Sequence, residues 1–509
     1  MRRFGVFALG LVMSVATPAC AQVTPPAAQI APEWQLPLAS IDERMLAFQE
    51  EAHIPGMVWG VVKGGKLLHF TANGVQDIET GAPVNAQSMF RIASMSKAFT
   101  ALAILKLRDD GKLRLDEPVE TYVPEFKSLK YPTTDSPRVR VRDLLSHVGG
   151  FVTDDPWGDR QQVISEAEFT AMLKAAPPFT RAPQTAFEYS NLGYATLGRI
   201  ITNVSGQPYD AYIKAQIMRP LGMNATTYEV RDVEPARLAR GYRWENEAWA
   251  LEPTMQHGVF GAMGGVVTSA DDYVKWIAFL LDAWPARDGA ETGPVRRSSV
   301  RELSQGLNFP MLVERPALDD GGAPCRYANN YGMGFNAGMD CDLGFTLAHS
   351  GGYPGYGSNL LMLPDQGVGL FVFANRTYAG PSLTNRLAAL ELHKAGVLTG
   401  REVAVNASLA SAYRAAGEMY RAGSIEPGRA MLAMNFLMDR SPENWSREFA
   451  RLKETAGTCS PDAPIKATGA MTGTFAWACE RGAIEGEILL APTNPPGIQA
   501  LRLRVREKE

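Results

Sequence analysis

The stretch FRIASMSKAFT, residues 90–100, carries a serine three residues ahead of a lysine. Apolar residues at helical spacing follow, so Ser94 and Lys97 fall on one side of a first helical turn. A serine hydroxyl becomes a nucleophile when a neighbouring base takes its proton, and burial can lower the pKa of a lysine enough for that task. The pair therefore predicts a nucleophile and its base. Taken alone, it is explained better by a serine helix cap and a surface lysine.

A second polar element, FEYSNLGYATLG at 187–198, carries Tyr189 and Asn191 two residues apart. In an extended loop these side chains project to the same side. A phenol can relay a proton to a leaving group, and an amide can hold a substrate carbonyl. The alternative is a buried tyrosine whose hydroxyl is satisfied by backbone. Tyr327-Ala328-Asn329 has the same spacing, but it lies between two cysteines and is interpreted as a loop.

A third element, AHSGGYPGYGS at 348–358, brings two adjacent glycines to the start of a predicted hairpin. Gly351 and Gly352 permit close approach of the backbone, and bare N–H groups on a strand edge can hold an oxyanion. The same residues are also similar to the nucleophile elbow of α/β-hydrolases. That elbow requires a helix directly after it, whereas a turn and a hairpin follow here, so this alternative is disfavoured.

The elements that must position these residues follow from hydrophobic periodicity. Two apolar runs at 54–74, joined by Gly64-Gly65, predict a hairpin. A helix is expected over 94–111, a second hairpin over 358–375 with its turn at 365–367, and a helix over 383–394. Strands near both ends with helices between them predict an α+β fold. We expect an antiparallel sheet flanked by helices, an inserted helical lobe and a cleft between the two.

The two ends of the chain differ from this region in composition and in hydrophobic pattern. Residues 1–21 have the basic start, apolar run and small-residue ending of a signal peptide cleaved after Ala21. A lipoprotein anchor at Cys20 is the less favoured alternative, because the preceding Thr-Pro-Ala is a poor lipobox. Residues 22–35 are rich in proline and alanine and are predicted to be a linker.

The rest of the chain divides into a domain over 36–400 and a C-terminal module over 401–509. The module shows two amphipathic helices and a hairpin that turns at 480–482, which predicts a small α+β unit. Nothing in it resembles a catalytic constellation, so its role stays unknown.

Composition and cysteine count limit the partners and cofactors. The formal net charge is −4 and no basic run occurs, which argues against nucleic acid as a partner. No later stretch is apolar and long enough to span a membrane. Four cysteines remain after the signal peptide, and the expected disulfides are Cys325–Cys341 and Cys459–Cys479, although four cysteines allow three connectivities. Metal motifs such as C-x-x-C or H-E-x-x-H are missing from the sequence, so no metal is expected.

The three polar elements, in this order, resemble the serine β-lactamase and penicillin-binding protein family. The likeness is greatest to the class C β-lactamase branch with its carboxylesterase and D-aminopeptidase relatives, and it covers roughly residues 36–400. Four further stretches are similar to family sequence patterns: RDLLSHVGGF (142–151), IMRPLGMNATTY (217–228), GAMGGVVTSADDYVKW (261–276) and YGMGF (331–335).

The resemblance implies a role for each polar element. Ser94 is implied as the acylated nucleophile, Lys97 as its base and Tyr189 as a second base and proton relay. Asn191 is implied to contact the substrate amide or ester. The family's K-T-G motif is represented here by His349-Ser350-Gly351, and the N–H of Gly352 would complete an oxyanion hole with that of Ser94. No cofactor or metal is implied.

Two departures from the family pattern bear on specificity. The K-T-G lysine grips a substrate carboxylate with a fixed charge, whereas His349 is mostly neutral near pH 7. This favours esters or amides without that carboxylate over β-lactams. Gln184 stands where the family has the glycine of P-G-T, with no clear consequence.

We therefore expect an exported, periplasmic or secreted serine hydrolase that forms an acyl-enzyme on small esters, D-amino-acid amides or peptides, with cell-wall peptide among the candidates. A class C-type β-lactamase or D-alanyl-D-alanine carboxypeptidase is the first alternative. The second is a non-catalytic cell-wall-binding or receptor homologue that uses the C-terminal module for partners.

Overall fold

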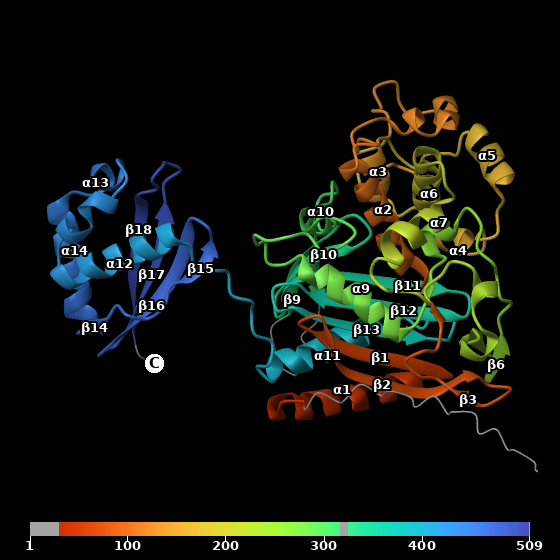
Figure 1. Ribbon diagram of the computed structural model, residues 1–509, viewed down its shortest axis with the longest axis horizontal. Helices are drawn as coiled ribbons and strands as arrows, with labels where there is room; N and C mark the ends of the chain where they lie inside the picture. The colour runs from red at the N-terminus through yellow and green to blue at the C-terminus, as the bar shows by residue number, and fades with distance from the viewer. Residues whose placement is uncertain (1–29, 316–323, 508–509) are drawn as a thin grey trace, which may run out of the picture.

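The structure is a computed structural model that describes residues 30–315 and 324–507. Within them, the main body is built on a nine-stranded sheet in which every adjacent pair is antiparallel (Figure 1). In spatial order the strands are β3 (Ala82–Pro83), β2 (Lys66–Asp77), β1 (Gly56–Lys63), β13 (Val368–Ala374), β12 (Tyr356–Leu363), β11 (Gly344–Tyr353), β10 (Asn336–Asp340), β9 (Cys325–Tyr331) and β8 (Met311–Arg315).

At the centre of this sheet, a strand from the beginning of the main body's sequence pairs with a strand from its end. β1 pairs with β13, and Met57 lies opposite Ala374. Both predicted hairpins are confirmed, β1–β2 and β12–β13. Gly64 and Gly65, in the first turn, have positive φ values of 56° and 77°, which glycine adopts without steric cost. The expected α+β fold, with a sheet assembled from both ends of the region, is therefore confirmed.

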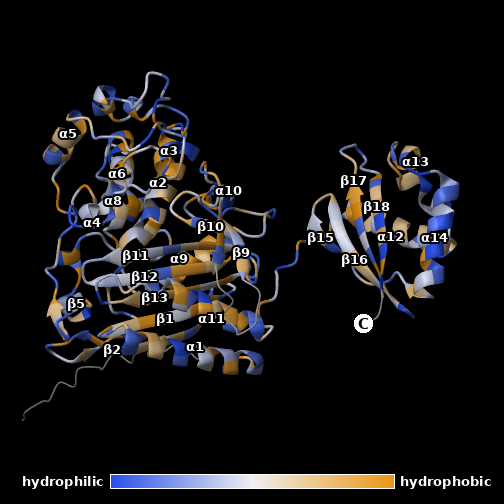
Figure 2. Cartoon of the chain, turned by 180° about the vertical axis from the view of Figure 1, so that it is seen from behind, coloured by the Kyte–Doolittle hydropathy of each residue, from blue (hydrophilic) through white to orange (hydrophobic). Residues whose placement is uncertain are grey.

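Alternate residues of the central strands face two different layers, because successive side chains of a strand point to opposite faces. Trp59 and Val372 belong to a core shared with α1 (Pro32–Glu51) and α11 (Ser382–Lys394). Val58 and Phe371 belong to a larger core shared with the helical lobe. Figure 2 shows hydrophobic residues along these central strands. The central strands β1, β12 and β13 are thus buried on both faces, which explains their continuous apolar runs.

The helical lobe lies on the side of the sheet opposite α1 and α11 (Figure 1). Its helices are α2 (Lys97–Asp109), α3 (Val141–Leu145), α4 (Asp155–Gly158), α5 (Glu166–Lys174), α6 (Asn191–Ser205), α7 (Tyr209–Ile213), α8 (Gly261–Gly264), α9 (Ala270–Asp282) and α10 (Arg297–Glu302). Short 3-10 turns are η1 (Ala93–Ser96), η2 (Val119–Thr121), η3 (Pro124–Ser128), η5 (Val230–Asp232) and η6 (Pro235–Arg237), and η4 (Lys214–Met218) is a π turn. Two small ladders are β4 (Phe90–Arg91) with β7 (Val267–Thr268), and β5 (Tyr242–Glu245) with β6 (Ala248–Leu251).

The N-terminal boundary differs from the expected one. The predicted signal peptide, with Ala21 and Cys20, lies outside the described residues. The predicted linker 22–35 is wrong at its end, because α1 begins at Pro32. A proline is tolerated in a first helical turn, and Trp34 is buried in the core beneath the sheet, so packing overrides the linker-like composition. Among the residues that the structure describes, no helix combines the length and the hydrophobicity needed to cross a bilayer.

The C-terminal residues form a separate core (Figure 1). Its helices are α12 (Ala407–Ala422), α13 (Phe436–Asp439) and α14 (Pro442–Ala456), with a 3-10 turn η7 (Glu426–Met431). Its strands are β14 (Cys459–Ser460), β15 (Lys466–Gly469), β16 (Thr472–Cys479), β17 (Gly482–Leu490) and β18 (Ile498–Glu507), all antiparallel. The predicted helices and the β16–β17 hairpin are confirmed. Arg401 still donates to a carbonyl of the main body, that of Leu281, at 3.0 Å.

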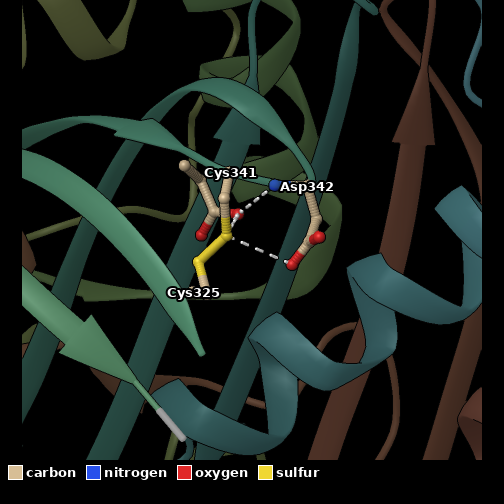
Figure 3. Close-up of side chains that lie close together, drawn as sticks. Cys325, Cys341 and Asp342 are labelled. Carbon is tan, nitrogen blue, oxygen red and sulfur yellow. Dashed lines mark hydrogen bonds between the residues drawn. A yellow bond between two sulfur atoms is a disulfide. The ribbon is translucent and has the colours of Figure 1, made fainter. Parts of the chain in front are cut away.

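Both expected disulfides are present, Cys325–Cys341 and Cys459–Cys479. Figure 3 shows the first of them beside Asp342. With Asp340, these groups are close enough to suggest a metal cluster. However, both thiols are consumed by the disulfide, and Arg386 pairs with both carboxylates at 2.9 and 3.4 Å. We therefore assign no metal to this cluster.

Candidate active site

The backbone ahead of Ser94 is strained. Ser94 lies in the 3-10 turn η1, and the α-helix begins only at Lys97. Ala93 has a φ of +47°, a left-handed conformation that costs an alanine about 1 kcal/mol and that is enriched at active sites. The Ser94 side chain is largely buried, with 8% of the residue exposed. The turn presents the hydroxyl to Lys97 at one side of the helix, as the spacing predicted.

Lys97 is fully buried and its amine contacts three oxygens. Nζ lies 3.0 Å from Ser94 Oγ, 2.7 Å from Asn191 Oδ1 and 3.0 Å from the carbonyl oxygen of Met263. The last two oxygens only accept hydrogen bonds. A neutral amine would donate its two N–H groups to them and turn its lone pair toward the Ser94 hydroxyl. This arrangement allows a neutral Lys97 to accept the serine proton.

The pKa of Lys97 is lower than that of an exposed lysine. Burial lowers the pKa of Lys97 to about 8, and the carboxylates of Asp155, Asp159 and Asp154 act in the opposite direction. An amine with this pKa is neutral in an appreciable fraction of molecules near neutral pH. An unperturbed lysine would be almost fully protonated there.

Tyr189 lies beside the same two residues. Its ring centre is 4.9 Å from Lys97 Nζ. Burial, and then the charge of Asp155, raise the pKa of Tyr189 well above its usual value, while a hydrogen bond with Ser94 acts against that rise. The phenol is therefore protonated at neutral pH. It can relay a proton by passing on its own, but it does not act as a standing phenolate base.

Asn191 connects the base to an acidic loop. It is the first residue of α6, which Ser190 caps by accepting from the backbone of the first turn. Its Oδ1 accepts from Lys97, and its Nδ2 donates to Asp155 at 2.9 Å. Asn191 is fully buried and orients the lysine amine. The expected contact of Asn191 with substrate stays a prediction.

His147, from the RDLLSHVGGF stretch, supports the tyrosine. Its ring lies 4.3 Å from that of Tyr189, and its Nδ1 accepts from the backbone N–H of Ser190 at 3.0 Å. Burial lowers the pKa of His147 well below its usual value, so the ring is neutral. Sequence reasoning assigned this histidine no role. The only signal was its place in a family-like stretch.

His349, on β11, is neutral and engaged on both ring nitrogens. Nδ1 lies 2.6 Å from the carbonyl oxygen of Ser350, which can only accept, so Nδ1 carries the proton. Nε2 then accepts from the Tyr331 hydroxyl at 2.9 Å. Burial and the nearby charge of Lys97 lower the pKa of His349 to about 3. The expectation of a mostly neutral His349 agrees with this geometry.

Gly351 of β11 lets that strand pack against the turn η1, which carries Ser94. Ser358, opposite Gly351 in the ladder, donates to the carbonyl oxygen of Ile92 at 3.0 Å. A Cβ added to Gly351 would lie 2.2 Å from the same oxygen. Real Cβ atoms do not approach so closely, so only glycine allows this packing two residues before Ser94.

Gly351→Ala is accordingly expected to lower the free energy of unfolding by about 1–3 kcal/mol, the cost of overpacking, and to reduce activity by moving η1. Gly400→Ala is the matched control, since its Cβ would meet nothing within 4 Å and its φ is not left-handed. Thermal and urea unfolding measure the stability of both variants. Equal stability of the two would contradict the close packing of β11 on η1.

A pocket of about 380 Å³ contains the Ser94 side chain. The structure brings together Ser94, Tyr189, His349 and Gly352 in its wall. The lining residues are Ser94, Asp155, Pro156, Asp159, Phe187, Tyr189, Tyr331, Asn336, His349, Ser350, Gly352 and Tyr378.

The Tyr327-Ala328-Asn329 triplet was predicted to be a loop, which is wrong, because it lies in β9. Its tyrosine is outside the pocket, whereas Tyr331 of the same strand lines it.

A serine beside a buried lysine and a tyrosine, on an antiparallel sheet that carries a helical lobe, is the arrangement of the β-lactamase and transpeptidase class of folds. The model of the Beta-lactamase family matches residues 41–394. The chain therefore belongs to this family.

Individual relatives agree with this assignment. The protein named flp of Staphylococcus aureus strain MW2 is 30% identical over 335 residues, which are 64% of this chain and 60% of flp. Penicillin-binding protein 4* of Bacillus subtilis is 26% identical over 62% of this chain and 66% of its own length. The match thus spans about three fifths of the flp chain. The octameric penicillin-binding protein homologue from Pyrococcus abyssi has a similar fold, with a TM-score of 0.58 and 21% identity over 92% of this chain and 99% of that one.

Proposed function

We propose that the protein is a serine hydrolase that forms an acyl-enzyme on Ser94. The observation that supports this most is the amine of Lys97, held between two acceptor oxygens so that its lone pair faces Ser94 Oγ at 3.0 Å. A non-catalytic binding homologue would have no need of a buried lysine whose pKa is lowered to about 8. Family membership supports the same reaction class.

In the proposed reaction, Ser94 Oγ attacks the acyl carbonyl of an ester or amide while its proton moves to Lys97. The carbonyl oxygen becomes an oxyanion, which the backbone N–H groups of Ser94 and Gly352 are proposed to stabilise. As the bond to the leaving group breaks, the proton from Lys97 reaches that group through the Tyr189 hydroxyl. Water then attacks the acyl-enzyme while one of its protons moves to the neutral Lys97. That proton passes to Ser94 Oγ as the acid is released, which restores the serine hydroxyl and the neutral lysine.

The substrate class follows from the charges of the pocket. Among the described residues that line it, none is lysine or arginine, and His349 is neutral. The pocket therefore lacks the cation that would hold the carboxylate of a β-lactam or a peptide terminus. We propose esters and amino-acid amides as substrates, D-configured ones included. Hydrolysis of β-lactams or of D-alanyl-D-alanine is the second candidate, which the family match and the likeness to penicillin-binding protein 4* support.

We further propose that residues 1–21 export the chain, that 36–400 are the hydrolase domain and that 401–509 are a separate module. Two disulfides support export, since they persist in oxidising compartments. The separate core of the module supports the domain division.

A substrate panel tests this proposal. Short-chain nitrophenyl esters and alanyl nitroanilides of both configurations are expected to be hydrolysed with a higher kcat/KM than nitrocefin. A fluorophosphonate probe is expected to label the wild-type chain stoichiometrically. Nitrocefin turnover faster than that of every ester and amide would favour the β-lactamase alternative, and absence of both labelling and turnover would favour a binding homologue.

A further inference from the structure

The pocket that contains Ser94 has an acidic wall. Asp155 and Asp159, at the two ends of α4, both line it. Asp159 is buried, with 4% of the residue exposed, and its Oδ2 accepts from the Tyr378 hydroxyl at 2.9 Å. Asp155 is exposed and its Oδ1 accepts from the Asn191 amide. Both carboxylates thus accept hydrogen bonds from neutral donors, and both line the pocket that contains the proposed nucleophile.

A third carboxylate nearby, Asp154, has a structural role. Its two oxygens accept from the backbone N–H groups of Asn191 and Leu192, at 2.6 and 2.9 Å, and so cap α6. Asp154 is absent from the pocket lining. Capping of α6 thus explains Asp154. It does not explain Asp159, whose carboxylate accepts from the Tyr378 side chain.

The two carboxylates are unfavourable for the reaction on their own. A general base must be neutral, and both carboxylates favour the protonated form of Lys97. Burial also raises the pKa of Asp159 to about 7, against the hydrogen bond from Tyr378 and the charge of Lys97. A cation that entered the pocket would compensate this charge and would also repel the proton on Lys97. Binding such a cation would therefore assist the base.

We propose that Asp155 and Asp159 bind a protonated amine of the substrate, so that the preferred substrates are esters or amides with an ammonium group next to the acyl carbonyl. Amides and esters of amino acids with a free α-amine have this arrangement. The proposal rests on the proposed acyl-enzyme function and specifies its substrate class. Because the cation also acts on Lys97, the preference is expected in kcat as well as in KM.

Matched substrates test the proposal. Alanine p-nitroanilide and its N-acetyl derivative differ in the charge of the amine, and both configurations are to be measured. The wild type is expected to favour the free amine by at least about tenfold in kcat/KM, which corresponds to about 1.4 kcal/mol. In Asp159→Asn, which keeps an oxygen for Tyr378, that selectivity ratio is expected to fall about tenfold. Glu79→Gln, a change of an exposed glutamate outside the pocket lining, is the control and is expected to keep the ratio.

Two further readouts guard against a folding defect. Asp155→Asn is expected to lower the same ratio, and circular dichroism with thermal unfolding reports whether each variant is folded. n-Butylammonium is expected to inhibit turnover of a neutral nitrophenyl ester more strongly than n-butanol does, and this difference is expected to shrink in Asp159→Asn.

A folded Asp159→Asn variant with the wild-type ratio would overturn the inference, as would a wild-type preference for the acetylated amide. These outcomes differ from failure of the proposed function, in which neither substrate nor a fluorophosphonate would acylate Ser94.

Discussion

Ser94→Ala is expected to lower kcat/KM for every hydrolysed substrate by about 10⁴-fold or more, the usual loss when a nucleophile is removed. Without Oγ the acyl group has no acceptor, and Lys97 has no proton to take. Ester hydrolysis and fluorophosphonate labelling both measure the change. The fold should survive, because alanine fits the space of serine and Lys97, which contacts Ser94 Oγ, keeps two other partners.

Ser96→Ala is the matched control two residues away. Ser96 is fully buried and its Oγ accepts from the backbone N–H of Val266 at 3.0 Å, outside the pocket. Its loss is expected to lower the free energy of unfolding by about 1–3 kcal/mol, because a buried donor is left unpaired, while activity stays within tenfold. A Ser94→Ala variant with activity within tenfold of the wild type would exclude Ser94 as the nucleophile.

Lys97→Met is expected to lower kcat/KM by about 10³-fold, within the range for removal of a general base. Methionine matches the unbranched stem of the buried lysine but cannot accept the serine proton. Because the pKa of Lys97 is lowered to about 8 and the neutral amine is the active form, wild-type kcat/KM is expected to rise with pH up to about 8 and to level above it. This rise of kcat/KM with pH, the acid limb of the pH profile, should disappear in Lys97→Met.

Lys106→Met provides the comparison on the same helix. Lys106 pairs with Asp110 near the surface and lies far along α2 from the pocket, so its loss is expected to leave the pH profile unchanged. Two observations would contradict the role of Lys97: an unchanged acid limb in Lys97→Met, or a wild-type rate that is independent of pH between 6 and 9.

Local patterns predicted much of the fold. The apolar runs of β1 and β13 with turn residues between strands sufficed for both hairpins, and helical spacing sufficed for α2 and α11. The S-x-x-K spacing put Ser94 and Lys97 together, because a helical turn fixes that relation regardless of the rest of the chain. The two disulfides join cysteines that are near each other in sequence, so their pairing could also be predicted.

The rest of the site depends on contacts between distant segments. Asp159 reaches the pocket from the end of α4 and meets Tyr378 from beyond β13, and Tyr331 meets His349 across the sheet. Hydrophobic periodicity carries no information on such pairs. The Tyr189–Asn191 pair was expected to face one way on a loop, but Asn191 opens a helix and turns toward Lys97.

Backbone strain was equally invisible in the sequence. Gln184, in place of the family's glycine, has a φ of +66°, and its Nε2 donates to Asp143 at 2.9 Å. A glycine would adopt this conformation without cost, so the departure from P-G-T has a structural consequence that sequence reasoning did not find. His147 and Tyr378 are also left-handed. Ala93 is as well, so strained positions recur around the proposed site.

The measurement that tests the central claim most directly is capture of the acyl-enzyme. Wild-type protein is mixed with a nitrophenyl ester, quenched in acid during turnover, digested with trypsin and examined by mass spectrometry. Cleavage after Arg91 and Lys97 releases the hexapeptide IASMSK, which contains both Ser94 and Ser96. The acyl mass is expected on this peptide, with fragment ions that place it on Ser94. Turnover with an unmodified hexapeptide, or with the acyl group on another residue, would contradict an acyl-enzyme on Ser94.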